Sequence, residues 1–169
     1  MGMMTVAQLQ THVYEDKMKN VEMLTPLLWQ AKEYHADFVC LPEMFACPYE
    51  TKNFPVYAEE EGGPLWTALS GLAKEFGVYL SAGAVPERTP EGKIRNTAYV
   101  FDRQGNQIAK HSKVHLFDID VKGGQSFKES DTLTPGDHST VFETEFGIMG
   151  LCICFDFRFP ELARRMALD

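Results

Sequence analysis

The sequence predicts an α/β fold built on a mixed β-sheet. Short apolar, β-tolerant segments alternate along the chain with segments of helical periodicity, which is the pattern of an α/β protein. Several of the strand-like segments are joined by turns rather than by helices, so some strand pairs are expected to be antiparallel. With 169 residues, the chain is long enough for one domain with a sizeable core, or for a large part of a bigger domain.

The first half of the chain predicts two strands and two helices. Residues 4–10 (MTVAQLQ) and 36–43 (ADFVCLPE) are apolar and β-tolerant, and both predict short strands. Between them, residues 16–34 carry apolar side chains at the spacing of one helix face, but Pro26 lies inside this pattern. Because proline disrupts a helix interior, the helix is expected to kink or restart there. A second helix is expected over residues 64–76, after a Gly-Gly-Pro sequence.

The second half of the chain predicts mainly strands. They are expected over residues 78–85, 95–102, a run ending near Lys113, 139–142 and 147–153. The segment PERTPEGK is rich in turn-forming residues and joins the first two of these strands. A polar, Gly-rich loop is expected over residues 118–137, which is too long for a plain connection. A final helix is expected to begin at about Pro160.

Charge and composition exclude several classes of function. The formal net charge of −8 argues against general nucleic-acid binding and leaves no basic patch for an anionic membrane. No apolar stretch approaches the length of a membrane span, and the N-terminus lacks a secretory signal pattern. We therefore expect a soluble, cytoplasmic protein that acts without a nucleic-acid or membrane partner.

The four cysteines are expected to be free thiols. In a cytosolic chain of this size, Cys40, Cys47, Cys152 and Cys154 are not expected to form a disulfide framework. The Cys-x-Cys spacing of the last two is too tight for a zinc knuckle, and no histidine pair completes such a site. We therefore expect no metal centre built on these cysteines.

Three chemically reactive side chains follow strand-like segments. Glu43 follows DFVCLP, Lys113 follows GNQIAKHS and Cys154 follows GIMGLCI. Sites in open α/β sheets gather beyond the carboxyl ends of strands, so these positions are candidates for a common site. Each also has an ordinary alternative explanation: a solvated loop glutamate, a surface lysine, or a buried cysteine that only packs.

The chemistry of the three side chains is complementary. Glu43 lies between apolar residues, so its carboxylate is expected to be partly desolvated, with a raised pKa suited to proton transfer. Lys113 can serve as a fixed cation that stabilises developing negative charge. The thiol of Cys154 lies at a predicted strand-to-helix turn, where helix amides and cations can activate it, whereas Cys152 is expected to pack. Two histidines beside the lysine give only weak support for a metal site.

Three segments resemble the signatures of one enzyme family. LPEMF, HSKVHLFD and GLCICFDFRFPE are similar to the three signature segments of the nitrilase superfamily of carbon–nitrogen hydrolases, in the order Glu, Lys, Cys. The resemblance runs from Met4 to the end of the chain. Within the superfamily, CPYETKNFPVYAE, HLFDIDV, FKES and TLTPGD look most like the omega-amidase branch.

The resemblance implies a nitrilase-like, four-layer α-β-β-α sandwich with mixed sheets. Members of the family are substantially longer, so residues 1–169 are expected to form a single incomplete hydrolase domain that lacks its C-terminal third. Apolar faces that would meet the missing part are then expected to be exposed, which favours association. The resemblance also implies a homo-oligomer, at least a dimer.

The resemblance implies amide hydrolysis through a cysteine thioester. Cys154 would be the nucleophile, and Glu43 would be the general base and later the proton donor to ammonia. Lys113 and the backbone N–H of Phe155 would stabilise the oxyanion of the tetrahedral intermediate. The substrate would be a small amide, such as the dicarboxylate mono-amide 2-oxoglutaramate, and no metal or organic cofactor is implied.

The resemblance assigns supporting roles to further residues. Glu129, in FKES, would orient the lysine and help to position the substrate, although without the resemblance it would be taken for a solvated loop acid. Tyr49 would line the substrate pocket. Arg158 is a candidate for contacting a substrate carboxylate, while Asp156, Arg158 and Glu161 are expected to form structural ion pairs.

Three alternatives stay open. The chain could be another amidase or a carbamoylase of the same superfamily, which ammonia release from a series of amides would distinguish. It could instead be an inactive, truncated chain that acts as a subunit or an interaction module. A cysteine protease is the weakest alternative, because none of the five histidines belongs to a recognisable motif.

Overall fold

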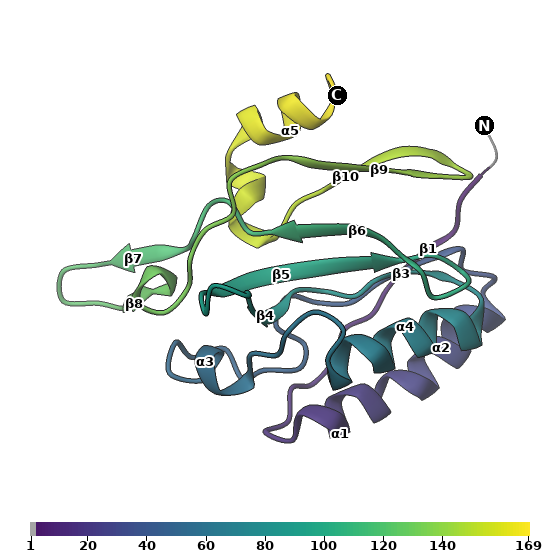
Figure 1. Ribbon diagram of the computed structural model, residues 1–169, viewed down its shortest axis with the longest axis horizontal. Coiled ribbons are helices and arrows are strands. Elements are labelled where there is room, and N and C mark those ends of the chain that lie inside the picture. The colour runs from purple at the N-terminus through teal and green to yellow at the C-terminus, as the bar shows by residue number, and fades with distance from the viewer. Residues whose placement is uncertain (1–2) are drawn as a thin grey trace.

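The computed structural model describes residues 3–169 as layers of helices and strands (Figure 1). The helices are α1 (Lys17–Glu22), α2 (Leu24–Glu33), α3 (Phe54–Tyr57), α4 (Pro64–Phe76) and α5 (Pro160–Met166), with the 3-10 helices η1 (Glu129–Asp131) and η2 (Cys154–Arg158). The strands are β1 (Val6–Gln8), β2 (Phe38–Cys40), β3 (Tyr79–Ser81), β4 (Val85–Arg88), β5 (Ile94–Phe101), β6 (Gln107–Ser112), β7 (Asp118–Asp120), β8 (Ser126–Lys128), β9 (Thr140–Thr144) and β10 (Gly147–Leu151). Among these residues, no helix is long and apolar enough to cross a membrane.

Six strands form one mixed sheet, as the sequence predicts. β1, β2 and β3 are parallel neighbours, and β3 then pairs antiparallel with β5. β3 and β4 lie along the same edge of β5, with Ser81 opposite Val100 and Val85 opposite Thr97. β6 pairs antiparallel with the other edge of β5. The short connections therefore supply the antiparallel pairs of the sheet.

Helices α1, α2 and α4 cover one face of this sheet (Figure 1). Leu28 of α2, Leu69 of α4 and Leu80 of β3 are buried together in the largest core cluster. The observed bounds of α4 are those that the sequence predicts. Pro64 can begin the helix because the first turn needs no N–H donor, and Gly77 ends it with a left-handed φ of 65°.

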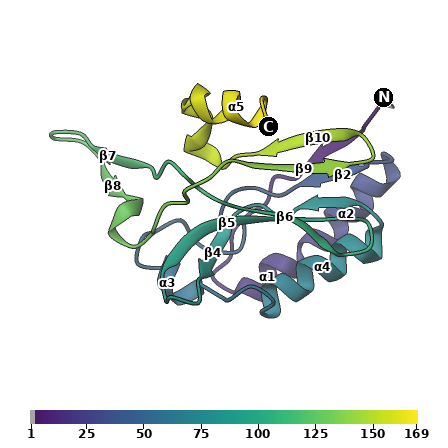
Figure 2. The same ribbon diagram turned by 45° about the horizontal axis from the view of Figure 1, so that its top comes forward.

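The hairpin of β9 and β10 lies against the opposite face of the sheet, and α5 lies outside that hairpin (Figure 2). Phe142 of β9 is buried against Phe38 and Val100 of the large sheet. On the outer side, Met166 of α5 lies so close to Gly150 that a β-carbon there would be 2.9 Å from the methionine sulfur. The layers therefore follow the predicted order of helix, sheet, sheet and helix.

The long helix that the sequence predicts is divided into α1 and α2. The Asp16 side chain accepts hydrogen bonds from the backbone N–H groups of Met18 and Lys19, and so caps α1. The helix is interrupted at Met23, and Pro26 lies in the first turn of α2. Because N–H groups in the first turn of a helix have no helical acceptor, the missing N–H of Pro26 removes no hydrogen bond from α2. The restart that the sequence predicts therefore occurs just before this proline.

Two segments that the sequence predicts as connections contain strands. β4 begins at Val85, the last residue of the strand predicted over residues 78–85, continues into PERTPEGK as far as Arg88 and forms a hairpin with β5. The expected loop 118–137 contains the β7–β8 hairpin, with Asp118 opposite Lys128, followed by η1. The loop prediction was wrong in both places because backbone pairing satisfies the N–H and C=O groups of polar segments as well as those of apolar ones. Helices α3, η1 and η2 were also not predicted, since each spans little more than one turn.

Candidate active site

Glu43 lies just after β2, where two backbone segments approach each other closely. The Glu43 backbone pairs with Ala84, and the N–H of Met44 donates to the carbonyl of Ala84 over 2.7 Å. A β-carbon on Gly83 would lie only 2.3 Å from the carbonyl oxygen of Pro42, and Gly83 has a φ of +49°. Because only glycine fits such a position, Gly83 allows the glutamate segment to lie against the segment between β3 and β4.

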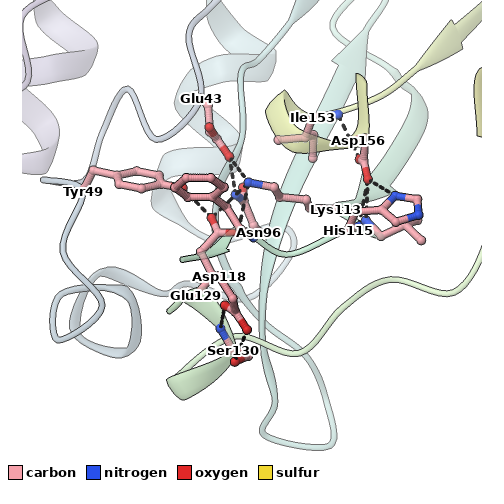
Figure 3. Close-up of polar contacts among 12 residues, drawn as sticks. Glu43, Tyr49, Asn96, Lys113, His115, Asp118, Glu129, Ser130, Ile153 and Asp156 are labelled. Carbon is pink, nitrogen blue, oxygen red and sulfur yellow. Dashed lines mark hydrogen bonds and ion pairs between the residues drawn. The ribbon is translucent and has the colours of Figure 1, made fainter. Parts of the chain in front are cut away.

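Lys113 lies just beyond β6 and is fully buried. Its backbone N–H donates to the carbonyl of Asn96 over 2.8 Å, which continues the pairing of β6 with β5. The ammonium donates to Glu43 Oε1 at 2.9 Å and lies 3.1 and 3.0 Å from the two carboxylate oxygens of Glu129 (Figure 3). Burial disfavours the charged form, but the two carboxylates outweigh it and raise the pKa of Lys113. The side chain is therefore a fixed cation rather than a surface lysine.

Glu129 is the first residue of η1 and is also fully buried. Its carboxylate accepts hydrogen bonds from the Tyr49 hydroxyl at 2.5 Å and from the backbone N–H of Phe117 at 2.6 Å. The Tyr49 ring stacks on Phe127 of β8, with the centroids 5.3 Å apart. Burial and then the bond to Glu129 raise the pKa of the Tyr49 phenol, so the hydroxyl keeps the proton that it donates. The β7–β8 hairpin and the helix η1 that directly follows it thus supply one aromatic support of Tyr49 and its carboxylate partner.

The Glu43 carboxylate has polar partners in addition to the apolar groups of the cavity that it lines. Besides the Lys113 ammonium, the side-chain amide of Asn96 donates to the same oxygen, Oε1, at 2.8 Å. Asn96 is buried in β5, so the sheet itself sets the position of this donor. The apolar surroundings that the sequence predicts are therefore only part of the environment, because the sequence neighbours of Glu43 do not reveal the side chains that β5 contributes. Asn96 was missed for the same reason, since no local motif marks it.

Cys154 is the first residue of η2, shortly after β10 ends at Leu151, and it lines the same cavity as Glu43. The cavity has a volume of about 190 Å³, and Leu41, Ala98 and Ile153 form part of its apolar wall. Cys154 has a left-handed φ of 46°. This conformation costs roughly 1–2 kcal/mol for a residue with a β-carbon, so the surrounding contacts must hold the turn.

The Cys154 thiol keeps its proton at neutral pH. Burial and then the nearby Glu43 carboxylate raise the pKa of Cys154 to about 11, although Lys113 acts in the opposite direction. The expected activation by helix amides and cations is therefore outweighed, and the sulfur depends on a base to remove its proton. Cys152 also differs from its expected packing role, since it is exposed and lines the same cavity.

The two remaining sequence candidates lie on η2. Phe155 is the second residue of this helix, so its N–H belongs to a first turn that offers no helical acceptor. This N–H directly follows Cys154, and a first-turn N–H of this kind can donate a hydrogen bond to an oxyanion. Arg158, the last residue of η2, is exposed. Among the described residues, it neither lines the cavity that holds Glu43 and Cys154 nor forms an ion pair.

Asp156 bonds to two histidines instead of pairing with Arg158. Its side chain is fully buried and lies 3.2 Å from His111 Nε2 and 2.9 Å from His115 Nδ1. Burial disfavours the carboxylate, but bonds from His111, His115 and nearby backbone amides lower the pKa of Asp156 to about 2. The predicted ion pairs of Asp156, Arg158 and Glu161 were therefore wrong for residues 3–169. The histidines on either side of Lys113 were the sequence signal that could have indicated these bonds.

The same two histidines have structural partners beyond Asp156. His111 Nδ1 lies 3.0 Å from Thr140 Oγ1 of β9, and the His115 ring stacks on Phe159 with the centroids 3.7 Å apart. In the part of the chain that the structure describes, no group of three or more histidine, cysteine, aspartate or glutamate side chains is arranged to hold a metal ion.

The chain matches known proteins over nearly its whole length. The family model described as carbon–nitrogen hydrolase covers residues 4–169. A hydrolase from Schizosaccharomyces pombe is 49% identical over 151 residues, which cover 88% of this chain and 47% of that protein. The omega-amidase NIT2 of Bos taurus is 43% identical over 164 residues, which cover 97% of this chain and 59% of that protein. The chain thus spans about half the length of the curated relatives that it matches.

Solved structures have the same arrangement of elements. Nit3 from Saccharomyces cerevisiae, described as a member of branch 10 of the nitrilase superfamily, superimposes with a TM-score of 0.84 at 38% identity, over 97% of this chain and 60% of that chain. An amidase from Nesterenkonia sp. AN1, in which acrylamide has been added to the active-site cysteine, superimposes with a TM-score of 0.81 at 26% identity, over 96% of this chain and 61% of that chain. The match of the family model, together with these relatives, shows that the chain belongs to the carbon–nitrogen hydrolases of the nitrilase superfamily and is similar to their omega-amidase members.

Proposed function

We propose that the protein hydrolyses the amide bond of a small molecule and releases ammonia through a cysteine thioester. The observation that carries this proposal is the buried Lys113 ammonium, held between Glu43 and Glu129 beside the cavity that Glu43 shares with Cys154. A thiol, a carboxylate and a buried cation supply the nucleophile, the base and the oxyanion donor that amide hydrolysis needs. The omega-amidase names of several relatives support the same reaction class.

In the first half-reaction, the sulfur of Cys154 attacks the carbonyl carbon of the amide. Glu43 accepts the thiol proton as the S–C bond forms; Lys113 and Asn96 both donate to its Oε1, which leaves Oε2 for that proton. The ammonium of Lys113 and the N–H of Phe155 stabilise the negative charge that develops on the carbonyl oxygen. When the intermediate collapses, the C–N bond breaks, and protonated Glu43 gives its proton to the departing ammonia.

In the second half-reaction, water hydrolyses the thioester. Glu43, ionised again, takes a proton from the water as its oxygen attacks the thioester carbonyl. Lys113 and the Phe155 amide again hold the oxyanion. The C–S bond then breaks, the sulfur of Cys154 takes back the proton from Glu43, and the carboxylic acid leaves. Glu129 holds the Lys113 ammonium in place during both half-reactions.

The proposed substrate is a small dicarboxylate mono-amide such as 2-oxoglutaramate. The cavity of about 190 Å³ is smaller than the roughly 300–1,000 Å³ typical of pockets for drug-sized ligands, a size that suits a small metabolite rather than a peptide. Tyr49, which donates a hydrogen bond to Glu129, is proposed to line the substrate pocket. Arg158 is proposed to bind the distal carboxylate of the substrate.

Replacing Arg158 tests the proposed recognition of the distal carboxylate. Arg158→Gln is expected to raise KM several-fold and leave kcat nearly unchanged, because the lost contact lies away from the reacting amide. Arg164→Gln, which replaces an exposed arginine of α5 rather than of η2, is the matched control. An Arg158→Gln variant with the KM of the wild type would remove Arg158 from the substrate site.

Ammonia release from 2-oxoglutaramate tests the reaction itself. The wild-type protein is expected to release ammonia, and Cys154→Ala is expected to release none because it cannot form the thioester. Cys152→Ala removes the neighbouring thiol from the same cavity and is the matched control, expected to keep most of the activity. Circular dichroism establishes beforehand that all three proteins are folded. No release by folded wild-type protein from any amide would contradict the proposed function.

The same assay separates the competing functions. Faster release from N-carbamoyl compounds or simple aliphatic amides than from 2-oxoglutaramate would assign the chain to another branch of amide hydrolases. Release from no amide at all would favour a subunit or interaction module.

Self-association is part of the same proposal. Ile148 of β10, Phe157 of η2 and Leu168 beyond α5 are 63%, 83% and 68% exposed, and all three are large and apolar. A second copy of the chain would remove such apolar side chains from water. Sedimentation velocity is expected to show a smaller species for Phe157→Ser than for the wild type. The proposed compartment is the cytoplasm, where free thiols such as Cys154 stay reduced.

A further inference from the structure

Asp156 accepts hydrogen bonds from both of the segments that carry Lys113 and Cys154. It lies two residues after Cys154, and Lys113 extends between Asp156 and Glu43 (Figure 3). The reaction proposed above gives Asp156 no chemical step. We propose that Asp156 is a positioning residue that holds the Cys154 turn and the Lys113 segment at a fixed separation, an inference that rests on the proposed function.

One oxygen of the Asp156 carboxylate holds the segment that follows Lys113. Oδ1 accepts hydrogen bonds from the backbone N–H of His115 at 2.8 Å and from that of Val114 at 3.2 Å. The same oxygen lies 2.9 Å from His115 Nδ1. The carbonyl of Lys113 in turn accepts a hydrogen bond from the N–H of Gly136 at 2.8 Å. Together with the bond from the Lys113 N–H to the carbonyl of Asn96, the main chain around Lys113 is bonded to three other segments, and Asp156 supplies one of them.

The other oxygen holds the residue that precedes Cys154. Oδ2 accepts a hydrogen bond from the N–H of Ile153 at 3.1 Å and lies 3.2 Å from His111 Nε2. The N–H of Asp156 itself donates to the carbonyl of Ile153 at 3.0 Å. Two hydrogen bonds thus join Ile153 to Asp156 across the turn that contains Cys154. These two bonds enclose the left-handed φ of 46° at Cys154, a strained conformation that persists only when its surroundings hold it.

Every group that bonds to this carboxylate is a hydrogen-bond donor or can act as one. Three are backbone N–H groups, and two are the rings of His111 and His115. An asparagine at this position would turn an NH₂ group toward some of these donors and break several bonds without changing the size of the side chain. Asp156→Asn is therefore an informative replacement.

Loss of these bonds is expected to reduce turnover more than substrate binding. In the proposed reaction, Asp156 touches no substrate and sets only where the Cys154 sulfur lies relative to Lys113. A displacement of about 1 Å at the reacting atoms lowers the rate by roughly a hundredfold. Asp156→Asn is thus expected to lower kcat by about a hundredfold with little change in KM.

A second readout does not depend on turnover. If the Cys154 turn moves away from Glu43, the thiol loses a neighbour that raises its pKa. Alkylation of Cys154 by iodoacetamide at pH 8 is then expected to become faster in Asp156→Asn than in the wild type. The variant is therefore expected to be less active and yet more readily alkylated.

Asp37→Asn is the matched control for a purely structural carboxylate. Asp37 accepts hydrogen bonds from the backbone N–H of Thr5 at 2.9 Å and from Arg103 at 2.8 Å, and it precedes β2 whereas Glu43 follows that strand. Both variants are expected to lose stability in urea unfolding, but only Asp156→Asn is expected to lose kcat and gain alkylation. An Asp156→Asn variant with wild-type kcat and wild-type alkylation would overturn the proposal.

A milder variant covers the case in which Asp156→Asn does not fold. His115→Phe keeps an aromatic ring stacked on Phe159 and removes only the Nδ1 partner of Asp156. It is expected to show the same two changes, each about several-fold in size. If the wild type releases no ammonia, the proposed function fails, whereas the alkylation comparison still reports the position of Cys154. Alkylation equal to that of the wild type in both variants would overturn the positioning role.

Discussion

At the scale of single residues, the site combines a charged lysine with an uncharged thiol. Burial and then the Glu43 and Glu129 carboxylates destabilise the Cys154 thiolate, whereas the same two carboxylates outweigh burial at Lys113 and stabilise its ammonium. The nucleophile therefore has to lose its proton during the attack, and Glu43 is the base that lies beside it. The cation is then available to the oxyanion rather than neutralised by a resting thiolate.

The pH dependence of alkylation follows from the raised pKa of Cys154. Because only the thiolate reacts, the rate with iodoacetamide is expected to rise about tenfold per pH unit above neutrality and to level off near pH 11. Glu43→Gln removes the negative charge that raises this pKa, so its midpoint is expected at lower pH. A Cys152→Ala background and peptide mass spectrometry report Cys154 alone. A wild-type midpoint at the ordinary thiol value of about 8.5 would contradict the prediction.

Acid stability follows from the lowered pKa of Asp156. Since this pKa is 3.8 in the unfolded reference and about 2 in the folded chain, the ionised carboxylate stabilises the fold at pH values above about 4. That contribution, about 2 kcal/mol, is lost as the pH falls through 2. The difference in free energy of unfolding between wild type and Asp156→Asn is expected to shrink as the pH falls below about 4. Urea unfolding at each pH measures it; a constant difference down to pH 2 would disprove the assignment.

At the scale of elements, backbone segments approach each other closely at two glycines beside the site. A β-carbon on Gly83 would lie 2.3 Å from the carbonyl oxygen of Pro42, next to Glu43. A β-carbon on Gly136 would lie 2.2 Å from the carbonyl oxygen of Ser112, next to Lys113. The main chain next to Glu43 and next to Lys113 therefore packs directly against other backbone, which fixes the position of the main chain that carries each side chain.

Adding one methyl group at Gly83 tests this close approach. Gly83 and Gly62 both have positive φ, at 49° and 81°, so alanine is strained at either position. Nothing lies within 4 Å of a β-carbon at Gly62, whereas Gly83→Ala also collides with the backbone of Pro42. Gly62→Ala is expected to cost about 1 kcal/mol and Gly83→Ala about 2–4 kcal/mol, with a loss of kcat only in the latter. Equal costs in urea unfolding would contradict the packing argument.

At the scale of the whole molecule, the site is divided between two β layers. Glu43 and Lys113 extend from the large sheet, whereas Cys154 follows β10 of the second layer. The two layers are joined by an apolar cluster in which Phe142 of β9 is buried against Phe38. The position of the thiol relative to the lysine therefore depends on packing between layers as well as on the bonds of Asp156.

Phe142→Ala tests the contribution of this packing. Removing a buried phenylalanine is expected to lower the free energy of unfolding by about 3–5 kcal/mol and to reduce kcat, because the second layer is no longer held against the first. Glu143→Ala, at the exposed neighbouring position of β9, is expected to change both quantities little. Urea unfolding and ammonia release measure the two effects. Full activity in a destabilised Phe142→Ala would show that layer packing does not position the thiol.

The sequence predicts elements well where side-chain pattern and burial coincide. The helix at 64–76 has its predicted bounds because an apolar face lies between a starting proline and a terminal glycine. The β7–β8 hairpin was not predicted, because its strands are polar and their pairing is a property of the backbone. Of the site residues, Glu43 and Cys154 could be predicted because each follows a strand-like segment. Asn96 could not be predicted, because it lies 53 positions from Glu43, the residue that it contacts.

By itself, the sequence determined the α/β class, the resemblance to carbon–nitrogen hydrolases and the three reactive side chains, since these depend on residue type, spacing and local periodicity. Only the tertiary structure decided that Glu43 has polar partners, that Cys154 keeps its proton and that Asp156 joins the lysine and cysteine segments. The physical reason is that protonation states and buried hydrogen bonds depend on groups from distant positions, which become neighbours only when the layers pack.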